Sequence, residues 1–158
     1  MDDPVRRHMR RLRLVVMAFL AALAAYAGLI IALPDPKAPA LPQAATLFWG
    51  LAFLAAANLA TLLPTYRAMM VAPRRVFAAG RQAERLLAAH LSAHIVALAR
   101  AQAVAVLGLL LFFLAERREW FWAFWAVAAC ATALLWPSRG KVVALVAPPG
   151  EAASAPSV

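Results

Sequence analysis

Four apolar runs divide the sequence, at residues 14–33, 44–63, 95–114 and 120–136. Only the third run contains a charged side chain, Arg100. A helix needs about 20 predominantly apolar residues to cross the hydrocarbon core of a bilayer, and each run is close to that length. The chain is 65% apolar, whereas soluble domains are roughly 45–50% apolar. The sequence therefore predicts an all-α integral membrane protein with four spanning helices.

The segments around these runs are short, so no room remains for a globular domain. We interpret residues 1–13 as a basic cytoplasmic N-terminus and residues 14–147 as one transmembrane domain. Residues 148–158 contain mainly Ala, Pro and Ser, with too little apolar mass to fold, and we expect a disordered tail there.

The third helix is expected to begin before its apolar run. Pro64 and Pro73 bracket the connection that follows the second run, and beyond Pro73 no breaker stronger than Gly80 interrupts the helical pattern. We therefore expect a basic amphipathic helix that starts near residue 74 in the cytoplasm and enters the membrane near Ile95.

The basic residues indicate which helix ends face the cytoplasm. Five Lys and Arg residues precede the first run, five lie between the second and third runs, and two follow the fourth, against one and two in the remaining loops. Cytoplasmic loops carry the excess of Lys and Arg, so we expect both termini in the cytoplasm and a multi-pass antiparallel bundle in a bacterial inner membrane. The net charge of +9 reflects this clustering at helix ends, and we expect no nucleic-acid partner.

Polar side chains inside a bilayer are costly and usually face protein or water. The rise of a helix places a few of them in one intramembrane layer on the cytoplasmic side: Asn58, Arg100, Gln102 and Thr132. For Asn58 and Gln102 we expect hydrogen bonds to neighbouring helices. For Arg100 three interpretations stay open: a side chain that reaches the inner headgroups, pairing with Asn58 or a carbonyl, or contact with an anionic ligand.

Two further groups of residues are expected at the inner interface. His90 and His94 are one helical turn apart, which is the spacing of two ligands to one metal ion, but two ligands do not complete a site. We therefore expect no metal and no cofactor, and we interpret these histidines as interfacial side chains. A basic strip is expected to attract anionic phospholipids: Arg74, Arg75, Arg81 and Arg85.

The stretch ALARAQAVAVLGLLL, residues 97–111, resembles the carboxylate-bearing helix of the ATP synthase ring subunit. It also resembles a helix of small, uncharacterised four-helix bacterial membrane proteins. In the ring subunit a stretch of small residues leads to a Glu or Asp and then to a Gly-Leu-aliphatic segment. Gln102 stands at the position of that carboxylate, and an amide does not titrate. The resemblance therefore implies a similar helix without proton carriage at this residue.

The sequence contains no nucleophile–base pair, metal shell or phosphate-binding loop that would indicate catalysis. We expect a non-enzymatic structural or accessory subunit, associated with other membrane subunits or with itself. The alternative is a transport subunit whose polar layer is completed by other chains. A lipid-modifying enzyme that uses the histidines at the inner interface is a third interpretation.

Overall fold

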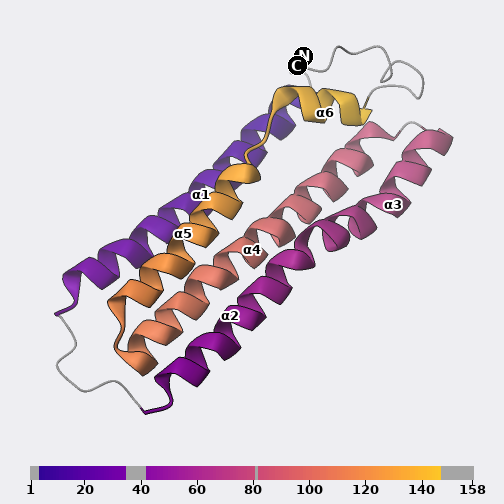
Figure 1. Ribbon diagram of the computed structural model, residues 1–158. Helices are drawn as coiled ribbons and strands as arrows, with labels where there is room; N and C mark the ends of the chain where they lie inside the picture. The colour runs from indigo at the N-terminus through magenta and orange to yellow at the C-terminus, as the bar shows by residue number, and fades with distance from the viewer. Residues whose placement is uncertain (1–3, 35–41, 81, 147–158) are drawn as a thin grey trace.

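The computed structural model describes residues 4–34, 42–80 and 82–146, which form helices and contain no strand (Figure 1). The predicted all-helical class is therefore confirmed. The tail predicted for residues 148–158 lies outside the described residues. In chain order the helices are α1 (Pro4–Ala32), α2 (Ala44–Ala60), α3 (Leu62–Gly80), α4 (Ala83–Ala115), α5 (Arg118–Leu134) and α6 (Arg139–Val146).

Helix α1 includes the basic segment as well as the first apolar run. It begins at Pro4, because proline has no N–H to lose and its fixed φ suits the first helical position. Its 29 residues correspond to about 44 Å, at about 1.5 Å per residue, whereas a hydrocarbon core is about 30 Å thick. The arginine-rich first turns therefore extend beyond the apolar part on the same helix.

Helices α2 and α3 follow one another with a single turn residue, Thr61, between them. Pro64 lies in the first turn of α3, where its missing N–H breaks no helical bond, and Pro73 lies inside the helix. The break comes instead after Gly80, and α4 begins at Ala83. This corrects the predicted start near residue 74: glycine, with its low helix propensity, ends α3, and Pro73 does not.

Helix α4 is the central element, because it packs against α1, α2, α3 and α5. Figure 1 shows it between α5 and the α2–α3 pair. Half of its most apolar stretch is buried, compared with 11% for α2–α3. The third apolar run is therefore the one around which the others gather.

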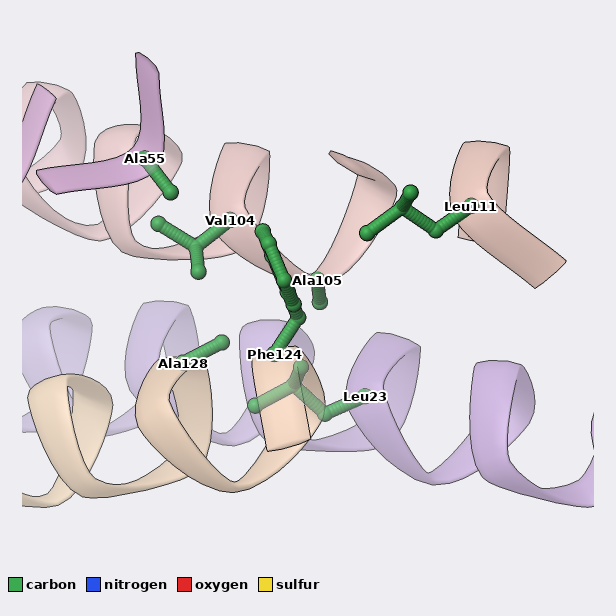
Figure 2. Close-up of a cluster of buried hydrophobic side chains, with 7 residues drawn as sticks. All are labelled: Leu23, Ala55, Val104, Ala105, Leu111, Phe124 and Ala128. Atoms are coloured by element: carbon green, nitrogen blue, oxygen red, sulfur yellow. The ribbon is translucent and has the colours of Figure 1, made fainter. Parts of the chain in front are cut away.

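Small residues bring α4 and α5 together. A Cβ atom added to Gly108 of α4 would lie 2.8 Å from the Cβ atom of Phe124 and 3.3 Å from the carbonyl oxygen of Phe121, both in α5. In Figure 2 the ring of Phe124 points from α5 toward Val104 and Ala105. Close approach at small residues is how helices associate where lipid supplies no hydrophobic driving force. The cluster in Figure 2 comprises Leu23, Ala55, Val104, Ala105, Leu111, Phe124 and Ala128.

Three helical segments are long and apolar enough to cross a membrane: α1, the α2–α3 stretch Ala44–Ala78, and α4. A fourth crossing requires α5 and α6 to act as one span, and their axes are bent by 51°. Length and composition are thus compatible with the predicted transmembrane class, with three crossings or up to four among the described residues.

Candidate functional site

The three histidines of the chain meet at one end of the molecule. His8 comes from the first turns of α1, and His90 and His94 come from α4. The Nε2 atom of His8 lies 3.0 Å from the Nδ1 atom of His90, and the rings of His90 and His94 stack with centroids 5.9 Å apart. All three side chains are buried. His8 was not predicted as a site residue, because no local pattern relates residues that are 82 positions apart.

Burial disfavours the charged form of these imidazoles. It lowers the pKa of His90 to about 4, with further contributions from His8, His94 and Arg74. Burial also lowers the pKa of His8, and the charge of Arg11 acts in the same direction. The hydrogen bond between the two rings needs one donor nitrogen and one acceptor nitrogen, so at least one of them is neutral. Both rings are therefore expected to be neutral at pH 7.

The histidines do not form a recognisable metal centre in the part of the chain that the structure describes. No group of three or more His, Cys, Asp or Glu residues there has an arrangement that could hold a metal ion. The rings of His90 and His94 stack at an interplanar angle of 28°. Stacked rings direct their nitrogen lone pairs within their own planes, so these two do not converge on one point between the rings.

A cavity of about 470 Å³ adjoins the histidines, between α3, α4, the end of α5 and α6. His90 and His94 line one side of it, and the Tyr66 ring, which also lines it, meets His90 edge-on with centroids 6.2 Å apart. Arg74 of α3 and Lys141 of α6 add two positive charges. None of the described residues that line this cavity is acidic. The cavity is therefore electropositive.

The predicted polar layer is only partly brought together. The side-chain nitrogen of Asn58 donates a 2.7 Å hydrogen bond to the carbonyl oxygen of Arg100, which confirms the expected bond between helices. The guanidinium of Arg100 donates to the hydroxyl oxygens of Thr61 and Thr65, at 2.9 and 3.0 Å. Among the described residues the Arg100 guanidinium thus pairs with hydroxyl groups near the α2–α3 turn, and not with the Asn58 side chain or with a carbonyl. Thr65 was not predicted as a partner, because it lies outside the apolar runs.

Gln102 and Thr132 do not join this network. Gln102 is buried, and among the described residues neither its amide nitrogen nor its amide oxygen has a partner, so the bond expected between helices is absent there. Thr132 is fully buried and donates to the carbonyl oxygen of Ala128 in its own helix, at 2.8 Å. The described layer thus consists of one group bonded between helices, around Asn58 and Arg100, one unpaired amide at Gln102, and one hydroxyl at Thr132 that is bonded within its own helix.

The basic strip is divided by the fold. Arg74, Arg75 and Arg85 are all exposed, but only Arg74 lines the cavity. Arg81 lies outside the described residues. Their common role as anionic-lipid contacts stays a prediction.

Comparison with known proteins gives no match for the chain among protein-family models, curated proteins or solved structures.

Proposed function

We propose that the chain is a multi-pass protein of a bacterial inner membrane, built as an antiparallel bundle of four crossings with both termini in the cytoplasm. Its apolar exterior supports this proposal. Trp49, Phe53 and Leu134 are 70%, 77% and 82% exposed. Helices α1, α2 and α3 carry further large apolar side chains that are exposed. Soluble monomers rarely expose contiguous apolar surface on this scale, whereas lipid tails cover it at no cost.

Three basic segments lie at the same end of the molecule, and this supports the proposed orientation in the membrane. The first turns of α1 pack against α4 and α6 in one cluster, which comprises Met9, Leu12, Leu87 and Val142. Helix α3 packs against α4 and α6 in a second cluster, which comprises Met70, Leu86 and Ala93 with Leu145 and Val146 at its edge. Three arginine- or lysine-bearing segments, far apart in sequence, thus share one end of the molecule. Such an end belongs on the cytoplasmic side of a membrane.

Within this frame we propose a non-enzymatic role as an accessory subunit of a membrane complex or as a homo-oligomer. The observation that carries this role is the bonding of Asn58 and Arg100, whose polar groups in the apolar region join helices to one another. Polar groups used in this way stabilise a scaffold. The exposed face of α2, with Trp49 and Phe53, then provides apolar surface for lipid or for a neighbouring subunit.

Purification in mild detergent tests the accessory role. We expect the protein to elute as a homo-oligomer or with another membrane protein at fixed stoichiometry. A monodisperse monomer from native membranes, with no partner after chemical crosslinking, would contradict it. Reporter fusions test the topology separately: fusions at Lys37 and Arg117 are expected to read external, and a fusion at Arg81 internal.

The unpaired amide of Gln102 favours a second candidate, a transport subunit with a polar site on the cytoplasmic side that other chains complete. A buried amide without a partner is a suitable position for a group supplied by another molecule. Purified protein in liposomes tests this candidate. We expect no proton or ion flux from the chain alone, and flux only after its partner is reconstituted with it.

A further inference from the structure

The electropositive cavity beside His90 and His94 has the size of a ligand site. Its volume of about 470 Å³ falls within the range of about 300–1,000 Å³ that small-molecule sites occupy. Its charged groups come from different helices, with Arg74 in α3 and Lys141 in α6. The hydroxyl groups of Tyr66 and Ser138 lie in the same lining. Two cations and two hydroxyl groups form a donor set that suits a phosphate group.

The two histidines that line the cavity add no charge of their own at neutral pH. His94 is only 6% exposed, and burial lowers the pKa of its imidazole, although an interaction with the Leu135 backbone opposes that shift. Burial likewise lowers the pKa of His90 to about 4. Arg74 and Lys141 therefore supply the positive charge of the cavity.

The rest of the lining is apolar and open. Leu63, Leu134 and Trp136 contribute to the cavity wall and remain 59%, 82% and 46% exposed. A free phosphate ion gains nothing from such a wall, whereas acyl chains cover it. Indole rings are also enriched at the level of the lipid headgroups. The lining therefore combines a headgroup site with a surface for hydrocarbon.

We propose that this cavity binds one anionic phospholipid of the inner leaflet. Arg74 and Lys141 hold its phosphate, and its acyl chains lie along Leu134 and Trp136. The proposal rests on the proposed placement of this end of the molecule at the inner membrane face. It goes beyond general attraction of lipids to basic residues, because it specifies one site and one lipid.

The test uses delipidated full-length protein in a neutral detergent, with phosphatidylglycerol as the probe. Native mass spectrometry counts the bound lipids, and the thermal midpoint is followed as the lipid concentration rises. The cavity variant is R74Q/K141Q. The matched control is R75Q/R85Q, which removes the same charge from exposed positions that do not line the cavity.

We expect one saturable lipid per chain for the wild type. The apparent affinity of R74Q/K141Q should fall by about 30-fold, because two direct charge-assisted contacts to the lipid phosphate are lost, each contributing about 1 kcal/mol at an exposed position. The affinity of R75Q/R85Q should stay within about threefold of the wild-type value, since the control retains the site. An equal loss in both double variants would mean unspecific attraction to the basic end and would overturn the proposal.

Two further probes identify the source of the phosphate. Phosphatidylcholine with the same acyl chains should bind at least tenfold more weakly than phosphatidylglycerol, and inorganic phosphate should not raise the thermal midpoint at the same concentration. Equal binding of phosphatidylcholine, or full stabilisation by inorganic phosphate, would overturn the assignment to an anionic lipid.

Topology is measured separately from lipid binding. If the Arg81 fusion reads internal but phosphatidylglycerol shows no saturable binding, the lipid site fails and the proposed membrane orientation survives. If the Arg81 fusion reads external, the orientation fails, and the cavity does not face the inner leaflet.

Discussion

The Nε2 atom of His8 lies 3.0 Å from the Nδ1 atom of His90, and this contact connects the first turns of α1 to the first turns of α4. It sets the position of α1 relative to α4 along the long axis of the bundle. Both helices exceed the thickness of a bilayer core, and the contact lies in the parts that precede their apolar runs. Substituting His8 or His90 is therefore expected to weaken the packing of α1 against α4 at the end of the molecule that carries the basic segments.

The first prediction concerns pH. The pKa of His90 is lowered to about 4 in the folded protein, so between about pH 6.5 and pH 4 the unfolded chain binds more protons than the folded chain. The stabilising contribution of the neutral pair is thus complete above pH 6.5 and is lost as the pH falls toward 4. We expect thermal unfolding in detergent to show this loss for the wild type and a smaller loss for H8F/H90F.

Carboxylates titrate in both proteins, so the difference between the two pH profiles is the quantity to measure. Parallel profiles would mean that His8 and His90 have ordinary pKa values in the folded protein and are hydrated there.

The second prediction concerns Asn58. Its hydrogen bond to the carbonyl oxygen of Arg100 joins α2 to α4. Replacing Asn58 by Ala should destabilise the protein by about 0.6–2 kcal/mol, the usual contribution of a hydrogen bond between membrane helices. The control is Thr46→Ala, an exposed position on the same helix, which should change stability by less than about 0.5 kcal/mol. Equal stability of the two variants would show that the Asn58 bond contributes nothing.

The third prediction concerns Gln102. Its buried amide has no partner among the described residues, so an apolar side chain of similar size removes a desolvation cost without breaking a bond. We expect Gln102→Leu to be neutral or to stabilise the isolated protein by up to about 1–3 kcal/mol, measured by thermal or denaturant unfolding in detergent. A loss of stability would instead reveal a bound water molecule or ligand at the amide.

The fourth prediction compares two glycines. A Cβ atom at Gly108 would approach the Cβ atom of Phe124 to 2.8 Å, so Gly108→Ala should separate α4 from α5 and cost about 1–3 kcal/mol. Nothing lies within 4 Å of a Cβ atom at Gly28, so Gly28→Ala should be neutral or stabilise α1 by up to about 1 kcal/mol. Unfolding measurements on both variants test the contrast, and similar effects would contradict the close packing at Gly108.

Local composition determined the helical class and the apolar segments. The second apolar run was predicted to begin at residue 44, where α2 begins, and the third to end at residue 114, one residue before α4 ends. Runs of apolar, helix-forming residues specify such elements without any distant contact. The hydrogen bond of Asn58 to another helix was also predictable, because an amide in an apolar run needs a partner.

The tertiary structure alone decided which distant residues meet. His8 reaches His90, Arg100 reaches Thr61 and Thr65, and Arg74 and Lys141 come to one cavity, although no pattern in the sequence relates them. The helix break after Gly80, in place of one at Pro73, is a further example. The physical reason is that helix formation depends on neighbours within one or two turns. The position of each helix along the bundle axis, and its rotation about its own axis, depend on how the side chains of all the helices pack together.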